Sequence, residues 1–391
     1  MSQIVKVEIH EFTHLVKNLG LLTNATTIGA VGYSRGSQTE VDKYAVVITT
    51  KDGIRGEYVT HWGGNAAACA QTKMLAPKLL DYGADERERI YDDFKRELRQ
   101  FDHMGHGPLD IALWDWAGKK SNCSISLLLG SYRKKLPAYA STYHGDRNGG
   151  LDSKEAFAAF AEECFDFGYK AFKIHGWHEG NVKEEAENLL HVAKMVGGKM
   201  TLMIDPACQL RTFADALYVG HACDDAGYFW LEDPYRDSGV SSFSHKRLRE
   251  SIKTPILQTE HIRGIEPKAD FLIAGGTDFL RSDPEYDLGI TGAMKIAHLG
   301  ECFGVDVEVH ACGPAHRHVM GAMRNTNFYE VALVGPDCPN TMAPVYMCGY
   351  SDMIDCVDKD GCVAVPEGPG LGVVYDWDFI KTNTKKITIF E

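Results

Sequence analysis

The period of the hydrophobic and polar positions changes near residue 136. Before it, an alternating segment at 4–12 and an apolar run at 44–50 are typical of strands, and a Gly/Thr/Asn-rich stretch at 18–36 predicts a long polar loop. Apolar residues then recur every three and four positions, which indicates helices at 66–80, 87–101 and 108–120. Residues 1–135 are therefore expected to form an α+β unit.

From residue 136 to 335, short apolar or β-branched runs alternate with helical segments such as 153–167 and 181–196. Strands that alternate with helices predict a parallel barrel. A final segment, 336–391, is rich in Gly, Pro and Cys and is expected to return to the first unit. The eight predicted strands are 137–142, 170–175, 201–205, 228–232, 255–259, 278–281, 305–309 and 327–330.

Composition and charge exclude several classes of partner. With 44% hydrophobic and 24% charged residues, the chain has the balance of a folded globular protein. Its formal net charge of -13 disfavours nucleic acid and anionic membranes, so a small-molecule ligand is expected. The N-terminus has no signal-peptide pattern, no run reaches 18 apolar residues, and the 11 cysteines include no CxxC pair. A cytoplasmic homo-oligomer with reduced thiols is predicted.

Ionisable residues occupy the predicted C-terminal ends of the strands, where barrel enzymes have their active sites. Asp205, Glu232 and Glu260 follow three successive strands at intervals of 27 and 28 residues. Neighbouring strands would bring these carboxylates together, and they would repel one another unless a cation joined them. All-oxygen ligands favour Mg²⁺ over zinc or copper. For any one of the three residues a salt bridge is the alternative, but their shared position predicts a Mg²⁺ site.

The next two strands end at Asp283 and His310, 27 residues apart. This pairing suits a carboxylate that orients an imidazole for proton transfer, although a single histidine in a barrel is often structural. On the second strand, Lys173 and His175 point inward together and offer another acid or base. The alternative is that Lys173 pairs with a metal carboxylate and His175 only caps the strand.

Two neighbours of these residues are expected to have supporting roles. Adjacent side chains on a strand point to opposite faces, so Asp233 faces away from Glu232 and is expected to anchor the turn before Pro234 or to support a neighbouring cation. Arg281 lies two residues before Asp283 and is expected to be an internal ion-pair partner.

The order of these residues resembles the mandelate racemase group of the enolase superfamily. Asp, Glu and Glu at successive strand ends are followed by the Asp/His pair and, 20 residues later, by Glu330, with a basic pair on the second strand. Segment 105–119 and the sequence PEGPGLGV near the C-terminus resemble the family's capping domain and tail. The resemblance covers nearly the whole chain. It implies a (β/α)7β TIM-like barrel with an α+β capping domain formed by the N-terminal region and the C-terminal tail.

The resemblance also implies an activity, abstraction of the proton α to a carboxylate. The most favoured reaction is dehydration of an aldonic or aldaric acid to a 2-keto-3-deoxy acid. Racemisation or epimerisation of a 2-hydroxy acid and a non-catalytic ligand-binding barrel are the alternatives. The implied site has Mg²⁺ on Asp205, Glu232 and Glu260, His310 oriented by Asp283 on one face of the α-carbon, Lys173 and His175 on the other, and Glu330 hydrogen-bonded to the intermediate.

One position departs from the family pattern. The second strand of the family carries Lys-x-Lys, whereas this chain has Lys173-Ile174-His175. An imidazole can do acid–base work near neutral pH, so the departure leaves open whether His175 or His310 removes the proton.

The substrate is expected to be bound by loops that cover the barrel mouth. The stretches 18–36 and 60–64 carry polar and aromatic side chains that suit a sugar acid, and ordinary solvated connections are the alternative. The histidine-rich segment 310–318 lacks the ligand spacing of a zinc site. The candidate substrate-binding residues are Tyr33, Arg35, His61, Trp62, His316 and His318.

Overall fold

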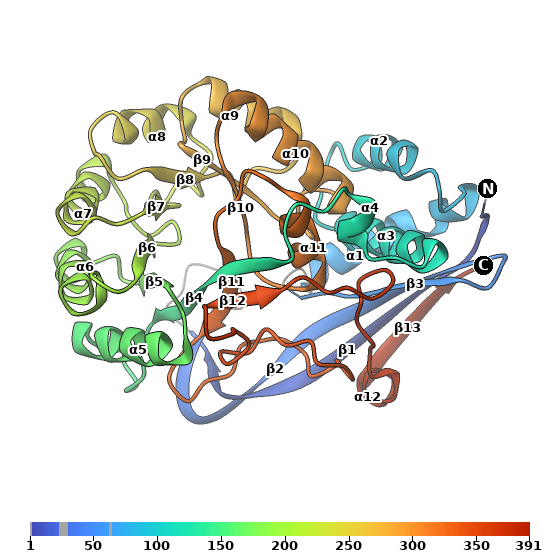
Figure 1. Ribbon diagram of the computed structural model, residues 1–391, viewed down its shortest axis with the longest axis horizontal. Helices are drawn as coiled ribbons and strands as arrows, with labels where there is room; N and C mark the ends of the chain where they lie inside the picture. Colours follow the sequence, from blue (N-terminus) through green and yellow to red (C-terminus); the bar gives the residue numbers. More distant parts are fainter. Residues whose placement is uncertain (1, 23–29, 62–64) are drawn as a thin grey trace.

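The chain folds into a barrel ringed by helices, with an antiparallel sheet against it and both termini at the far end of that sheet (Figure 1). The computed structural model describes residues 2–22, 30–61 and 65–391. None of the helices within these ranges has the length and apolar character needed to cross a bilayer. Trp62, a candidate substrate-binding residue, lies outside the described residues.

All eight predicted barrel strands are confirmed. The strands are β4 (Lys135–Gly145), β5 (Ala171–Trp177), β6 (Thr201–Asp205), β7 (Trp230–Glu232), β8 (Ile256–Gln258), β9 (Phe279–Ser282), β10 (Val307–Val309) and β11 (Tyr329–Val334). They pair in parallel in the order β10, β9, β8, β7, β6, β5, β4, β11, so β10 and β11 are the two ends of a nearly closed sheet. A helix follows each strand except the last, which gives the expected (β/α)7β order.

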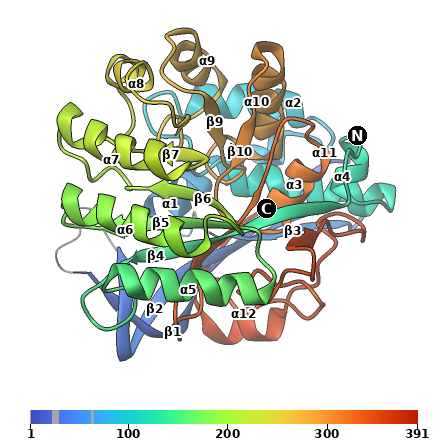
Figure 2. The same cartoon turned by 60° about the vertical axis from the view of Figure 1, so that its left-hand side comes forward.

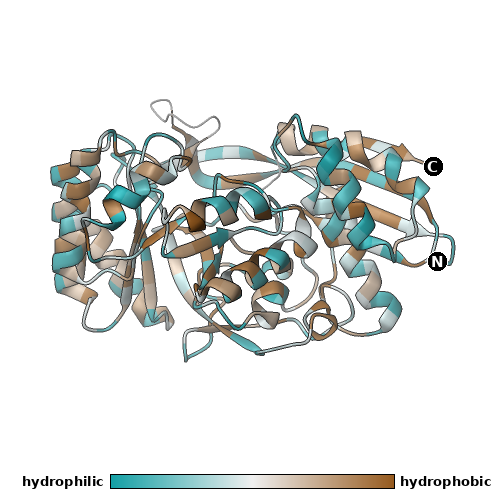
Figure 3. Ribbon diagram, turned by 90° about the horizontal axis from the view of Figure 1, so that it is seen from above, coloured by the Kyte–Doolittle hydropathy of each residue, from teal (hydrophilic) through white to brown (hydrophobic). Residues whose placement is uncertain are grey.

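The barrel helices begin and end at capping residues. The helix α5 (Lys154–Phe167) begins after Ser153, whose side chain accepts a backbone hydrogen bond, and ends at Gly168 with φ 117°. Hydrophobic and hydrophilic positions share each helix, as expected for helices with one face on the barrel (Figure 3). The other barrel helices are α6 (Val182–Val196), α7 (Phe213–Ala226), α8 (Ser242–Arg249), α9 (Ile265–Ile273), α10 (Gly289–Phe303) and α11 (Pro314–Ala322). Figure 2 shows α5, α6 and α7 stacked outside their strands.

The barrel interior is apolar at its floor and ionisable at its mouth. Tyr139 and Leu257 belong to the buried apolar cluster at the floor. Strand residues two positions apart face the same side, so the residue two positions beyond a floor residue stands above it. The pairs, floor residue first, are Ala171 and Lys173, Met203 and Asp205, Trp230 and Glu232, and Phe279 and Arg281.

The capping unit is built on a four-stranded antiparallel sheet in the order β13, β1, β2, β3. The C-terminal strand β13 pairs with β1, so the tail joins the N-terminal region as the predicted fold class requires. The helices lie where the three- and four-residue periodicity indicated them. The elements are β1 (Ile4–Leu21), β2 (Val31–Thr50), β3 (Arg55–Val59), α1 (Ala66–Leu75), η1 (Ala76–Asp81), α2 (Arg87–Glu97), α3 (Gly107–Ser121) and β13 (Thr384–Phe390).

The prediction of a polar loop over 18–36 is wrong for its described parts. β1 continues to Leu21, β2 begins at Val31, and Leu19 pairs with Tyr33 across the hairpin. Both of these side chains are buried in a small apolar cluster, and this packing outweighs the weak strand propensity of the surrounding Gly and Asn residues. Residues 23–29 lie outside the described residues.

The capping unit contacts the barrel beside the strand that leads to Asp283. In α3, Asp110 accepts hydrogen bonds from the backbone N and side-chain Oγ1 of Thr291, at 3.0 and 2.7 Å. The Tyr58 hydroxyl donates to Glu285 Oε1 at 2.6 Å. The cap is thus joined to the loop that follows β9 and to the first turn of α10. The remaining elements are α4 (Ile125–Leu128), β12 (Cys362–Ala364), which pairs with β4, and α12 (Trp377–Asn383).

Candidate active site

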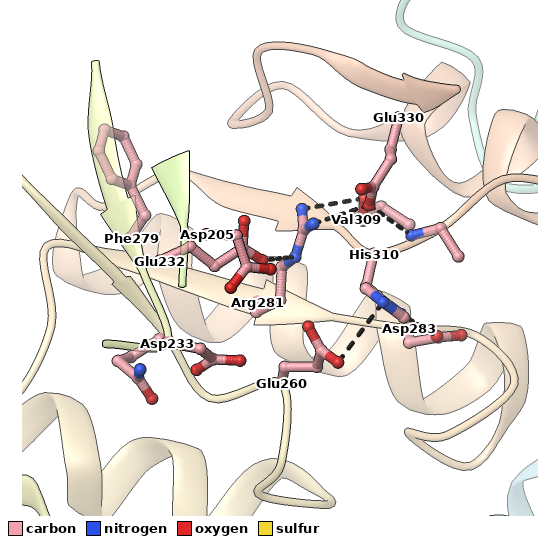
Figure 4. A network of polar contacts seen from close by, with 12 residues as sticks. Asp205, Glu232, Asp233, Glu260, Phe279, Arg281, Asp283, Val309, His310 and Glu330 are labelled. Atoms are coloured by element: carbon pink, nitrogen blue, oxygen red, sulfur yellow. Dashed lines mark hydrogen bonds and ion pairs between the residues drawn. The ribbon is translucent and has the colours of Figure 1, made fainter. Parts of the chain in front are cut away.

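Three carboxylates meet at the barrel mouth. Asp205 is the last residue of β6, Glu232 is the last of β7, and Glu260 follows β8 by two residues. One oxygen of each lies within 4.8 Å of an oxygen of the other two. Figure 4 shows these side chains together beside Arg281, with Asp233 on the other side of Glu232. Three clustered carboxylates fit a hard divalent cation, and all-oxygen ligation favours Mg²⁺.

Lys173 and Arg281 lie buried beneath the carboxylates and join Glu232 to Glu330. Lys173 Nζ is 2.8 Å from Glu232 Oε2 and 3.0 Å from Glu330 Oε1. Arg281 Nε is 2.8 Å from Glu232 Oε1, and its Nη2 is 2.7 Å from Glu330 Oε2. The expected internal ion-pair role of Arg281 is confirmed, and the geometry of Lys173 matches the alternative in which it pairs with a metal carboxylate.

The two bridged glutamates differ in their proton affinity. Burial raises the pKa of Glu232 to about 8, although Arg281 and Lys173 oppose the rise. Burial would also raise the pKa of Glu330, but the charges of Lys173 and Arg281 hold it well below its usual value. A cation beside Glu232 would favour its ionised form. A cation bound by Asp205, Glu232 and Glu260 would thus offset the cost of burying the Glu232 carboxylate, and this set of residues fits a metal ion.

The predicted pair of Asp283 and His310 is formed. His310 Nδ1 lies 2.7 Å from Asp283 Oδ2, and His310 Nε2 lies 3.5 Å from Glu260 Oε1. Burial alone would lower the pKa of His310, but the charge of Glu260 and the hydrogen bond with Asp283 raise it to about 9. The imidazole is thus oriented from one side and faces the carboxylate set on the other.

His175 lies across the carboxylate set from His310. Its Nδ1 is 2.7 Å from the carbonyl oxygen of Thr142, and its Nε2 is 3.1 Å from Asp205 Oδ2. Because the carbonyl oxygen can only accept, Nδ1 carries a proton and donates a hydrogen bond to the Thr142 carbonyl. The geometry thus turns Nε2 of both histidines toward the carboxylates.

Two candidate substrate-binding residues are next to the Asp283–His310 pair. His61 Nε2 lies 2.9 Å from Cys312 Sγ, just beyond β10, and the backbone N of His61 donates to Glu285 Oε1 at 2.5 Å. His316 Nε2 lies 3.4 Å from Asp283 Oδ1, so this buried ring contacts the carboxylate oxygen of Asp283 that His310 does not contact.

Three other candidates are elsewhere. Tyr33 is buried in the apolar cluster of the β1–β2 hairpin, and Arg35 is exposed on the same hairpin. His318 accepts from the Ser126 backbone N at Nδ1, at 3.2 Å, and its Nε2 is 3.0 Å from the carbonyl oxygen of Leu371. Both ring nitrogens of His318 are therefore occupied by backbone partners, and the side chain is fully buried on α11.

Sequence reasoning missed two aromatic neighbours of the histidines. The Tyr286 ring stacks against the His310 ring, with centroids 6.1 Å apart and planes at 22°. The His144 ring lies edge-on to the His175 ring, at 5.0 Å. His144 lies near the end of the first predicted strand, and Tyr286 lies three residues after Asp283. A search that continued a few residues beyond each predicted strand end would have found both.

Two family models match the chain. The model described as "Enolase C-terminal domain-like" matches residues 156–379, which include all of the candidate metal ligands and the Asp283–His310 pair. The model described as "Mandelate racemase / muconate lactonizing enzyme, N-terminal domain" matches residues 21–130.

Relatives and solved structures agree with these matches. The chain is similar to D-glucarate dehydratase from Agrobacterium tumefaciens, solved with magnesium, with a TM-score of 0.84 and 28% identity over 98% of this chain and 100% of that one. It is 24% identical to L-talarate/galactarate dehydratase of Salmonella typhimurium, over 78% of this chain and 77% of the relative. It is also 24% identical to arabinonate dehydratase of Saccharolobus solfataricus, over 84% and 87%.

Proposed function

Because this chain belongs to the enolase superfamily and, within it, to the mandelate racemase group, we propose that it is a Mg²⁺-dependent dehydratase of a sugar acid. The reaction removes water from an aldonic or aldaric acid and yields a 2-keto-3-deoxy acid. The observation that carries the proposal is the distance of 3.5 Å between His310 Nε2 and Glu260 Oε1, which sets a carboxylate-oriented imidazole against the three-carboxylate set. The acid-sugar dehydratases among the relatives favour the same chemistry.

The proposed metal ligands are Asp205, Glu232 and Glu260. Their oxygens lie within 4.8 Å of one another, and burial raises the pKa of Glu232 to about 8, a cost that a bound cation would offset. When bound, Mg²⁺ supplies positive charge that stabilises negative charge developing on the substrate carboxylate. This charge also reconciles an anionic substrate with an acidic protein.

His310 is the proposed base. Since Nδ1 donates to Asp283, Nε2 is the atom that accepts the proton from C2 of the substrate. The hydroxyl at C3 then leaves as water after it takes a proton from an acid, which is His310 itself or His175. The resulting enol takes a proton at C3, releases the proton of its C2 hydroxyl and becomes the 2-keto acid. Glu330, fixed by Arg281 and by the backbone N of Ala311 at 2.8 Å, is the proposed hydrogen-bonding partner of the substrate.

The proposal extends to the organisation of the protein. Residues 1–135 and 336–391 would form the cap and residues 136–335 the catalytic barrel, with His61 and His316 nearest the substrate. The free thiols of the described cysteines favour a reducing compartment, and the cytoplasm is the proposed location. We propose a homo-oligomer as the assembly, and the ligand as a small carboxylate rather than nucleic acid or a membrane.

A library of aldonic and aldaric acids tests the function directly. Incubation with the protein and Mg²⁺ is expected to give a 2-keto-3-deoxy product from at least one acid. The second candidate is a racemase or epimerase, favoured by the position of His175 across the carboxylates from His310. Exchange of the C2 hydrogen in D₂O with inversion, and with no keto product from any acid, would replace the dehydratase proposal with this one.

The metal site has a test that does not depend on turnover. A ligand that binds only the folded state stabilises it by about 2.7 kcal/mol at 100 times its dissociation constant. Mg²⁺ is therefore expected to raise the melting temperature of the wild type but not that of Asp205→Asn. Asp278→Asn, on the partly exposed carboxylate beside Arg249, is the matched control and should keep the rise. An equal rise in Asp205→Asn would contradict the proposed ligand set.

A further inference from the structure

A second group of metal-ligating side chains lies beside the three carboxylates. Cys208 Sγ, an Asp233 oxygen and a His261 ring nitrogen all lie within 4.8 Å of one another. His261 Nε2 is 3.2 Å from Asp233 Oδ2. The group shares no residue with the proposed Mg²⁺ site, whose ligands are Asp205, Glu232 and Glu260. A thiol, an imidazole and a carboxylate therefore converge at a point that the proposed reaction does not use.

The backbone holds this group in place. The Cys208 backbone N donates to the Asp233 carbonyl at 2.7 Å, and the Leu210 N donates to the Pro234 carbonyl at 3.1 Å. The pairing of β6 with β7 thus continues into the loops that carry Cys208 and Asp233. His261 follows β8, the next strand in the sheet. Three consecutive strand-end loops each contribute one ligand. Because the barrel already holds these loops side by side, binding an ion there costs little additional conformational entropy.

One oxygen of the Asp233 carboxylate in this group lacks a hydrogen-bond donor among the described residues. Asp233 is 1% exposed, and its Oδ1 has no hydrogen-bond partner among the described residues. A buried carboxylate oxygen without a partner carries a large desolvation cost. A cation shared with Cys208 and His261 would supply the missing interaction.

We propose that Cys208, Asp233 and His261 form a binding site for a borderline-soft divalent cation such as Zn²⁺. Mixed sulfur, nitrogen and oxygen ligands select such ions, whereas Mg²⁺ takes oxygen ligands. Two ligands of a tetrahedral zinc, with bonds of about 2.0 to 2.1 Å, lie about 3.3 Å apart, close to the 3.2 Å between His261 and Asp233. Three protein ligands leave the fourth position open to water or to another ligand.

The site has a consequence for the neighbouring carboxylates. His261 Nε2 also lies 3.8 Å from Glu260 Oε1. A zinc ion on His261 would therefore be close enough to attract Glu260 away from the proposed Mg²⁺ site. Zinc is expected to lower the affinity of the protein for Mg²⁺, and the reverse follows by linkage.

Cobalt is the probe that separates the two sites, because the Asp205–Glu232–Glu260 set contains no sulfur. Wild-type protein saturated with Mg²⁺ and kept reduced is titrated with Co²⁺, and the near-ultraviolet thiolate-to-cobalt charge-transfer band is recorded. The wild type is expected to develop the band at one Co²⁺ per chain, and Zn²⁺ should abolish it by displacement. Cys208→Ser should lose the band, and the exposed Cys302→Ser should keep it.

Affinity measurements give a second readout that does not need sulfur. His261→Asn should weaken Zn²⁺ binding at least about 10- to 100-fold, the loss that even outer-shell changes produce. Circular dichroism checks that each variant is folded. No charge-transfer band in the wild type, or a band that persists in Cys208→Ser, would overturn the proposal. Because these measurements follow binding and not turnover, failure of the sugar-acid assay would leave them unaffected.

Discussion

The two histidines of the mouth differ in their partners. His310 Nδ1 is paired with the carboxylate of Asp283, whereas His175 Nδ1 donates to the carbonyl oxygen of Thr142. A carboxylate stabilises the imidazolium that forms when a base takes up a proton, and a neutral carbonyl does so less. This difference favours His310 as the base and His175 as the group that supports Asp205 or donates to the leaving hydroxyl.

His310→Asn is expected to abolish most of the dehydration. Loss of a positioned acid–base group typically costs about 10²- to 10⁴-fold in rate. The measurement is kcat on the substrate found in the acid library, together with exchange of the C2 hydrogen in D₂O. The exposed His298→Asn on α10 is the matched control and should retain wild-type turnover. If His310→Asn kept its C2 exchange while His175→Gln lost it, the assignment of the base would be reversed.

Arg281→Met is expected to destabilise the protein strongly when Mg²⁺ is absent. The guanidinium is fully buried between Glu232 and Glu330, and its removal leaves two buried carboxylates that share the single cation Lys173 among their described partners. Breaking a buried ion pair costs about 3 to 5 kcal/mol. Urea unfolding measures the loss.

The exposed pair of Arg89 and Glu86 provides the comparison for Arg281. Arg89→Met should change the free energy of unfolding by less than about 1 kcal/mol. Equal effects of Arg281→Met and Arg89→Met would mean that the bridge between Glu232 and Glu330 contributes nothing specific.

The helices and strands of the barrel were predictable because each has a local signal. Alternation fixed the inward side of β5, so Lys173 and His175 could be assigned to the mouth from sequence. The β1–β2 hairpin was not predictable, because Leu19 and Tyr33 become strand residues only through pairing across the hairpin. The group of Cys208, Asp233 and His261 was also missed, since nothing local indicates that three loops converge.

Gly107 tests how closely the cap helix α3 must approach the barrel. A Cβ at this position would lie 2.2 Å from the carbonyl oxygen of Glu285, which is rigid backbone two residues beyond Asp283. Gly107→Ala should therefore displace α3 or the loop and cost about 1 to 3 kcal/mol, as overpacking does. Unfolding in urea gives the cost, and turnover should fall as well because the loop begins at Asp283.

Gly198 offers the control for Gly107, because a Cβ built there meets nothing within 4 Å. Gly198→Ala should leave both stability and turnover within error of the wild type or raise stability slightly. A tolerated Gly107→Ala would show that the cap and the barrel can separate without affecting the site.

Charge in this molecule is divided between an acidic surface and a buried polar network. The net charge of -13 favours solubility and cannot attract an anion, so recognition of a carboxylate substrate depends on the metal and on the basic side chains at the mouth. Several buried histidines lie outside this network. Because burial disfavours the charged form of a histidine, these side chains make the stability of the whole fold depend on pH.

The stability of the protein is expected to fall as the pH drops from about 6.5 toward 3, partly through buried histidines. Burial lowers the pKa of His106 to about 3 and of His318 to about 4. Below pH 6.5 the unfolded chain takes up protons that the folded chain refuses, so each such group removes about 1.4 kcal/mol per pH unit until its folded pKa is reached.

His106→Leu isolates one of these contributions. The ring of His106 packs against Phe94 with centroids 5.6 Å apart, and neither ring nitrogen has a hydrogen-bond partner among the described residues, so a leucine loses no polar contact there. Urea unfolding between pH 7 and 4 should show a shallower acid loss in His106→Leu than in the wild type. His298→Leu, on an exposed histidine, should keep the wild-type slope. Parallel curves for His106→Leu and the wild type would mean that the pKa of His106 in the folded state is close to its ordinary value.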